Sequence, residues 1–152
     1  MSWLIPIIIF FDQITKKTAE TILVHNPIKI GIFELTYVEN TGVAFGLFRG
    51  KALIHGIIAT IIVTFLYFFR EQYLRSNHIF NFSFDLGMCF IISGALGNIF
   101  DRIRLGYVVD IISWQDFTVF NIADIFITFG GIILLYHLVR RSLHGKSDLQ
   151  SK

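Results

Sequence analysis

Four aspartates lie between residues 101 and 124, where the chain leaves one apolar segment and enters the next: Asp101, Asp110, Asp116 and Asp124. A carboxylate at the rim of a membrane is costly, so acidic residues there usually have a function. Two carboxylates that a fold brings close together cannot both ionise easily, and they share a proton. Such a pair can take a proton from water and protonate a carbonyl or a leaving amine, which is the chemistry of aspartic proteases.

Two of these aspartates also have structural interpretations. Asp110 lies between β-branched residues, where partial desolvation raises the pKa of a carboxyl group, although Arg102 or Arg104 could hold it in an ordinary ion pair. Asp124 could be the N3 acid of a capping box that begins at Asn121, a place that the helix dipole also favours. Fourteen positions separate the two aspartates, enough for the chain to fold back and bring them together. The presence of both aspartates at a spacing that lets the chain bring them together favours a catalytic pair.

Other polar residues have a spacing that would support such a pair. Asp12 and Lys16 stand at i and i+4, so they can pair on one helix face, which should turn inward in a membrane. Asn98, Asp101 and Arg102 stand at i, i+3 and i+4 and form one polar face at a helix end. The alternative for this second group is a polar C-terminal turn stabilised by local hydrogen bonds.

Other classes of site have no support in the sequence. The single cysteine, Cys89, lies within an apolar run, and Ser113 has no histidine at an indicative spacing, which argues against a thiol or serine hydrolase. There is no Cys/His cluster and no HExxH motif, so we expect no metal site. The net charge is only +2, without a long basic run, so nucleic-acid binding is not expected.

The composition indicates a membrane protein. The chain is 54% hydrophobic and 16% charged, whereas soluble domains contain about 25% charged residues. We predict a single polytopic membrane domain over residues 1–152, an all-α membrane protein with one small sheet. Its four transmembrane helices are expected near residues 2–23, 53–69, 79–100 and 122–139. Gly94 and Gly97 in the third helix would permit close approach of a neighbouring helix.

The segment between the first two helices, residues 24–51, has the pattern of a sheet. Phe33, Leu35 and Tyr37 alternate with polar residues, the period of a half-buried strand, and Asn40 to Gly42 supply turn residues. We expect a small extracytoplasmic β-sheet at the membrane surface. Lysine and arginine are denser in the polar link after residue 69 and in the polar tail after residue 139, which favours cytoplasmic termini.

Taken together, the motifs resemble the lipoprotein signal peptidase family, also called signal peptidase II. Any one of the matching blocks would be a weak signal, but five of them follow the family's order across nearly the whole chain. The blocks are Asp12-Gln13-Ile14-Thr15-Lys16, Glu39-Asn40-Thr41-Gly42-Val43-Ala44-Phe45, Gly94 to Arg102, Gly106-Tyr107-Val108-Val109-Asp110 and Phe120-Asn121-Ile122-Ala123-Asp124.

The resemblance implies a multi-pass aspartic endopeptidase of the bacterial inner membrane, with four transmembrane helices and an extracytoplasmic β-cradle. It implies removal of the signal peptide from diacylglyceryl-modified prolipoproteins just before the lipidated cysteine, without metal or organic cofactor, and binding of globomycin-type inhibitors. We expect a monomer in contact with membrane lipids, with its active site near the extracytoplasmic face. The family's catalytic pair corresponds to Asp110 and Asp124. Its other functional positions correspond to Asp12, Lys16, Asn40, Gly42, Ala44, Asn98, Asp101, Arg102, Asn121 and Ala123.

Several alternatives accompany this hypothesis. Asp101 is the rival of Asp110 for the first catalytic role, while Asp116 reads as a solvated loop acid. The acids could instead carry protons in a subunit of a proton-coupled transporter, or the chain could be a homologue that binds lipoproteins without cleaving them. The connector from Asp110 to Asp124 is a few residues shorter than is usual for the family, which bears on the shape of the substrate groove.

Overall fold

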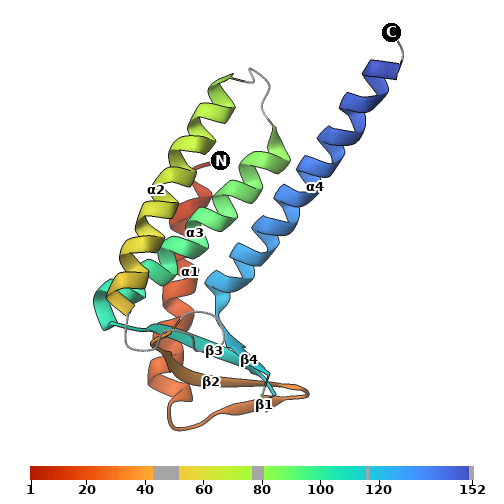
Figure 1. The fold of residues 1–152 in the computed structure, drawn as a ribbon. Coiled ribbons are helices and arrows are strands. Elements are labelled where there is room, and N and C mark those ends of the chain that lie inside the picture. Colours follow the sequence, from red (N-terminus) through yellow and green to blue (C-terminus); the bar gives the residue numbers. More distant parts are fainter. Residues whose placement is uncertain (43–51, 77–80, 116, 151–152) are drawn as a thin grey trace.

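A computed structural model describes residues 1–42, 52–76, 81–115 and 117–150, in which helices stand over a small antiparallel sheet (Figure 1). The helices are α1 (Leu4–Thr18), the π-helical segment η1 (Ala19–Leu23), α2 (Ala52–Ser76), α3 (Phe82–Leu105) and α4 (Ile122–Gln150). The strands are β1 (Ile28–Ile30), β2 (Phe33–Asn40), β3 (Val108–Trp114) and β4 (Thr118–Phe120).

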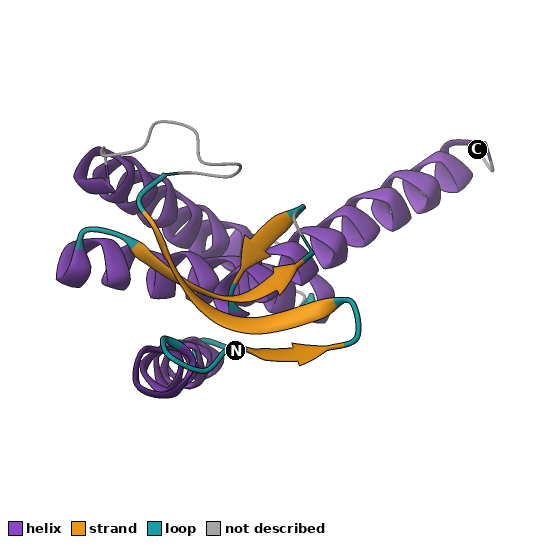
Figure 2. Cartoon of the chain, turned by 90° about the horizontal axis from the view of Figure 1, so that it is seen from below, coloured by secondary structure: helices purple, strands orange, loops and turns teal. Residues whose placement is uncertain are grey.

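The sheet has the strand order β1-β2-β3-β4 with every neighbouring pair antiparallel, and it lies across the ends of the helices (Figure 2). β1 and β2 come from the segment that the sequence predicted to form a sheet. β3 and β4 come from the connection between α3 and α4, where we expected no strands. The sheet therefore joins two segments that are far apart in the sequence, and it brings the end of β2 beside the start of β3.

Three of the described helices are long and apolar enough to cross a membrane: Leu53–Ser76, Phe82–Leu105 and Ile122–Leu143. They correspond to the second, third and fourth predicted spans. α1, at the place of the first predicted span, has only 15 residues before it passes into η1, and it carries the charged residues Asp12 and Lys16. It is therefore not among the candidate spans in the described part of the chain.

Two helices run past the ends of the predicted spans. The expected polar link after residue 69 is helical as far as Ser76, because Arg70 is buried and its Nε donates to Asp85 of α3 over 2.7 Å. A charge with a buried partner can lie within a helix instead of marking its end. The expected polar tail is likewise helical, since α4 extends to Gln150.

Small residues allow α3 and α4 to approach closely. A Cβ atom at Gly130 would lie 2.7 Å from the carbonyl oxygen of Gly87, and one at Gly94 would overlap the carbonyl oxygen of Ala123. A Cβ atom at Gly97 would lie 2.6 Å from Asp12 Oδ2. The prediction that Gly94 and Gly97 permit close approach is thus confirmed, and Gly97 also makes room for a carboxylate of α1.

The end of α3 directs the chain into β3. Gly106 has φ +80°, a left-handed conformation that glycine adopts without strain, and its N–H donates to the carbonyl oxygen of Arg102 over 3.1 Å. The strand begins two residues later, at Val108. This sharp turn holds the polar end of α3 close to the first residues of β3.

Gly94→Ala should lower the free energy of unfolding by about 1 to 3 kcal/mol, because the added methyl group has no space against α4. Gly131→Ala is the matched control, since a Cβ there meets nothing within 4 Å. The control should leave stability unchanged or raise it by up to about 1 kcal/mol through helix propensity. Denaturation of both variants in detergent micelles tests this, and equal effects would contradict the packing.

Candidate active site

The start of α4 is a capping box, as the sequence predicted. Asn121 Oδ1 accepts a hydrogen bond from the backbone N–H of Asp124 over 3.0 Å. In return, Asp124 Oδ2 accepts from the backbone N–H of Asn121 over 3.2 Å. Two otherwise unpaired backbone donors of the helix are satisfied in this way. The amide nitrogen of Asn121 remains available to other groups.

That amide nitrogen reaches the second aspartate. Asn121 Nδ2 donates to Asp110 Oδ1 over 2.9 Å and also lies 3.1 Å from Asn98 Oδ1 and 3.3 Å from the carbonyl oxygen of Val109. Asn121 is fully buried. One side chain therefore contacts both Asp110 and Asp124, so the two aspartates meet at the junction of β3 with α4.

Asp110 is buried among neutral amides. Its second oxygen, Oδ2, accepts from Asn40 Nδ2 over 2.9 Å, and only 1% of the residue is exposed. The ion pair with Arg102 or Arg104 considered from the sequence does not occur among the described residues. Burial raises the pKa of Asp110 to about 6, and the charge of nearby Asp124 adds to this rise, while the hydrogen bond from Asn40 opposes it. Asp110 can therefore bind a proton near neutral pH.

Asn40 is held in place by the turn that follows β2. Its Oδ1 accepts from the backbone N–H of Gly42 over 3.0 Å, which leaves Nδ2 directed at Asp110. Arg102 spans the same region, since its two terminal nitrogens lie 3.4 Å from the carbonyl oxygens of Gly42 and Asn98. Ala44, the other residue expected in this turn, lies outside the described residues.

Lys16 of α1 occupies the centre of a buried polar cluster. Its ammonium nitrogen lies 2.9 Å from Asp12 Oδ2 and 2.8 Å from Asp101 Oδ2, so the expected i,i+4 pair is present and a second carboxylate joins it. The ammonium also donates to Asn98 Oδ1 over 2.9 Å. Asn98 Nδ2 in turn donates to Asp124 Oδ1 over 2.9 Å. Hydrogen bonds thus connect Lys16 with Asp124 through a single amide.

The acids of this cluster also fix the backbone around the pair. Asp12 Oδ1 accepts from the N–H of Ala123 over 3.0 Å, which ties α1 to the start of α4. Asp101 Oδ2 accepts from the N–H of Val109 over 3.2 Å, which ties α3 to β3. The oxygens of Asp101 are engaged by Lys16, Val109 and Gln13, so this aspartate lies in the supporting cluster.

Gln13 is a residue that the sequence reasoning missed. Its Nε2 donates to Asp101 Oδ1 over 2.9 Å and lies 3.2 Å from Asp12 Oδ2. Its position next to Asp12 in a motif block was the available signal, but a neutral amide beside that aspartate did not by itself predict a role. Among the described residues, the hydrogen-bond donors to Asp12, Asp101, Asp110 and Asp124 are one ammonium group, several side-chain amides and backbone N–H groups. No group of three metal-ligating side chains occurs among the described residues.

The sequence is similar to those of known signal peptidases. A family model described as "Signal peptidase (SPase) II" matches residues 4–140. A lipoprotein signal peptidase of Caldicellulosiruptor bescii is 42% identical over 140 residues, which cover 90% of this chain and 89% of that protein. One of Clostridioides difficile is 42% identical over 144 residues, covering 90% of this chain and 92% of its own length.

Two solved structures have the same fold. The first is described as a bacterial membrane enzyme solved by the in meso method at 2.3 Å resolution; it has a TM-score of 0.81 and 31% identity, covering 93% of this chain and 88% of its own. The second, with the same description at 1.9 Å resolution, has a TM-score of 0.76 and 32% identity, covering 90% of this chain and 91% of its own.

The raised pKa of Asp110 makes stability depend on pH. Its folded-state pKa of about 6 exceeds the ordinary value of 3.8, so proton binding stabilises the fold. The contribution is complete below about pH 4 and is lost as the pH rises through 6; two pKa units correspond to about 3 kcal/mol. Denaturation between pH 4 and 8 should show the native chain losing about that much relative to Asp110→Asn. Parallel curves for the two proteins would contradict the shift.

Lys16→Met should lower the free energy of unfolding by about 3 to 5 kcal/mol, because it leaves the buried carboxylates of Asp12 and Asp101 without their cation. Adding Asp101→Asn to this variant should recover part of the loss, since one unpaired charge is then removed. Thermal denaturation of the two variants in detergent measures both effects. A Lys16→Met protein as stable as the native chain would rule out the ion cluster.

Proposed function

Because the chain belongs to the signal peptidase II family, we propose that Asp110 and Asp124 are the catalytic pair with which it cleaves its substrates. The protein removes signal peptides from prolipoproteins, and it is a membrane protein of the bacterial inner membrane. The observation that carries the proposal is the contact of one buried residue, Asn121, with both carboxyl groups: its amide donates to Asp110 and its backbone N–H to Asp124. That geometry supports an aspartic mechanism, and the ion pair of Asp101 with Lys16 supports a positioning role for Asp101.

In the proposed first step, Asp124 acts as the base and Asp110 as the acid. Asp124 receives N–H donors on both oxygens, from Asn98 and from the backbone of Asn121, which hold its carboxyl group in a fixed orientation. Asp110, with its pKa raised to about 6, holds the shared proton. Asp124 takes a proton from water while the water oxygen attacks the scissile carbonyl carbon. Asp110 protonates the carbonyl oxygen, and a neutral tetrahedral intermediate results.

In the second step, the intermediate collapses and the carbon–nitrogen bond breaks. Asp124 returns its proton to the leaving amine, and Asp110 recovers one from a hydroxyl of the intermediate as the carboxyl product forms. The side-chain amides of Asn40 and Asn121 hold Asp110 in position through both steps. The amide of Asn98 and the backbone N–H of Asn121 hold Asp124. Arg102, close enough for its charge to act on both aspartates, limits the cost of holding two acids together.

We propose that α1 and η1 supply a fourth membrane crossing. α1 has 15 residues and η1 has 5, and the combined 20 residues are about the length that spans a bilayer. Two of their charged groups, Asp12 and Lys16, are buried, whereas Phe10 and Phe11 are 61% and 57% exposed. The more exposed charges, Lys17 and Glu20, pair with each other near the sheet end of the helix. A helix with that division directs its deeper charges into the protein and its apolar side chains to lipid. Both termini then lie on the cytoplasmic side and the sheet on the extracytoplasmic side.

This arrangement accounts for cleavage beside a lipidated cysteine. A diacylglyceryl group anchored in the bilayer holds the scissile bond at the depth of Asp110 and Asp124. The bond is therefore already positioned relative to the two carboxyl groups when the substrate binds. The protein acts as a monomer in this proposal, because the described site is built from one chain. Globomycin-type inhibitors would compete with the substrate for the same carboxyl groups. Membership of a peptidase family favours this function over proton-coupled transport.

Asp124→Asn and Asp110→Asn should each lower kcat by about 100- to 10,000-fold, since each removes one of the two proton-transfer groups. The measurement is cleavage of a diacylglyceryl-modified precursor peptide by the full chain in detergent. The same assay tests whether the protein is a homologue that binds lipoproteins without cleaving them. The matched control is Glu34→Gln, whose side chain lies on the sheet away from the site. Normal cleavage by the Asp124→Asn protein would rule out the mechanism, and loss of activity confined to Asp101→Asn would assign the acid role to Asp101.

A further inference from the structure

Large apolar side chains are exposed together at the end of the sheet that lies farthest along β3 from Asp110. Their exposed fractions run from 39% for Phe33 to 67% for Phe117. We call this group the apolar tip, and it consists of Ile28, Ile30, Ile32, Phe33, Trp114 and Phe117. Contiguous exposed apolar groups of this size mark a surface that is covered by a partner or by lipid.

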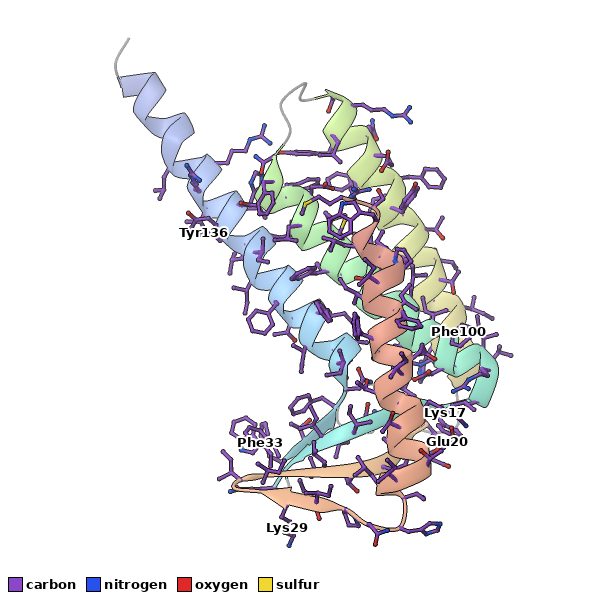
Figure 3. The ribbon with its side chains drawn as sticks, turned by 180° about the vertical axis from the view of Figure 1, so that it is seen from behind. Lys17, Glu20, Lys29, Phe33, Phe100 and Tyr136 are labelled. Carbon is purple, nitrogen blue, oxygen red and sulfur yellow. The ribbon has the colours of Figure 1, made fainter. Side chains whose placement is uncertain are left out.

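The strand register places the apolar tip on one face of the sheet. Ile30 pairs with Phe33, and Phe33 pairs with Trp114, so the three side chains project to the same side. Lys29 and Glu34 pair directly across the same strands and project to the opposite side. Figure 3 shows Phe33 on the side of the hairpin that faces the helices and Lys29 on the side that faces away. The end of the sheet is therefore amphipathic, with its apolar face toward the helices.

The aromatic members of the apolar tip lie against one another. The ring centroids of Phe33 and Trp114 are 6.0 Å apart, and those of Trp114 and Phe117 are 5.6 Å apart in an edge-to-face arrangement. Tryptophan combines a large apolar ring with one N–H donor, and it is enriched where a protein passes from hydrocarbon to lipid headgroups. This cluster has the composition of a membrane-interface anchor.

The apolar tip is continuous with a part of the chain that faces lipid. β4 leads through the single residue Asn121 into α4, whose first 22 residues are a candidate membrane span with exposed side chains such as Phe129 and Ile132. Side chains alternate along a strand, so Trp114 also projects to the same face of β3 as Asp110. The apolar face of the sheet is thus linked through one residue to a helix with exposed apolar side chains, and it is the face of β3 that carries Asp110.

We propose that the apolar tip is a lipid-docking surface that inserts into the leaflet around the start of α4. Lipid covers the apolar face, while Lys29 and Glu34 remain in water on the other side. Trp114 lies four positions after Asp110 along β3, a span of about 13 Å at 3.3 Å per residue. Because a strand is stiff over that distance, the docked tip holds Asp110 at a fixed depth relative to the lipid headgroups.

Tryptophan fluorescence can test this docking directly, because the chain contains only two tryptophans. In the Trp3→Phe protein, Trp114 is the sole emitter. The full-length variant would be reconstituted in vesicles of phosphatidylcholine whose acyl chains carry bromine, and separately exposed to iodide in vesicles without bromine. We expect strong quenching by the brominated lipid and weak quenching by iodide.

Ser113 supplies a matched control from the other face of the sheet. In a protein that carries Trp3→Phe, Trp114→Phe and Ser113→Trp, the emitter projects to the side of Lys29 and Glu34. The apolar tip is preserved in this variant, since phenylalanine replaces tryptophan. Its fluorescence should respond in the reverse order, with strong quenching by iodide and weak quenching by bromine.

Three results would overturn the proposal. Strong iodide quenching of Trp114 without bromine quenching would show that water covers the apolar tip. Protection from both quenchers that disappears when the protein is diluted in excess lipid would assign the surface to a second copy of the chain. Bromine quenching seen only with a brominated diacylglyceryl precursor would assign it to the substrate. None of these readouts depends on catalysis, so the proposed function and this docking surface stand or fall separately.

Discussion

The structure depends most on the buried ammonium group of Lys16. An isolated charge in this interior would be prohibitively costly, and the cost is offset by the carboxylates of Asp12 and Asp101, 2.9 and 2.8 Å away. These partners come from α1 itself and from α3. Asp12 also accepts a hydrogen bond from the backbone N–H of Ala123, and Asp101 accepts one from the backbone N–H of Val109. One cation therefore holds together the helices and the strand on which Asp110 and Asp124 lie.

The same cation determines the orientation of the amides around those acids. An ammonium group can only donate hydrogen bonds, so Asn98 must present its oxygen to Lys16 and its nitrogen to Asp124. Asn121 presents its oxygen to the N–H of Asp124, which turns its nitrogen toward Asp110. Each amide has one orientation that satisfies all of its partners. Both carboxyl groups consequently receive fixed donors, and the geometry of the pair is set before a substrate binds.

Spacing along the chain predicted the local parts of this arrangement. The capping box of Asn121 and Asp124 and the pair of Asp12 with Lys16 follow from periodicity alone, since both are contacts within a helical turn. β3 was missed because its first four residues are buried on both faces and show no alternation of polar and apolar side chains. Gln13 was missed because its partner, Asp101, lies 88 positions away. Contacts at that range depend on packing, which no local pattern encodes.

The short connector between the two acids has a structural consequence. After Asp110 the chain continues along β3, turns at Gln115 with φ +47°, and returns along β4, so that Ile112 pairs with Phe120. Asn121 follows at once and begins α4. The connector is thus a hairpin whose ladder fixes the distance between its ends, and added residues would lengthen its turn without moving Asp110. The paired strands, and not the length of the turn, therefore hold the two carboxyl groups together against their mutual repulsion.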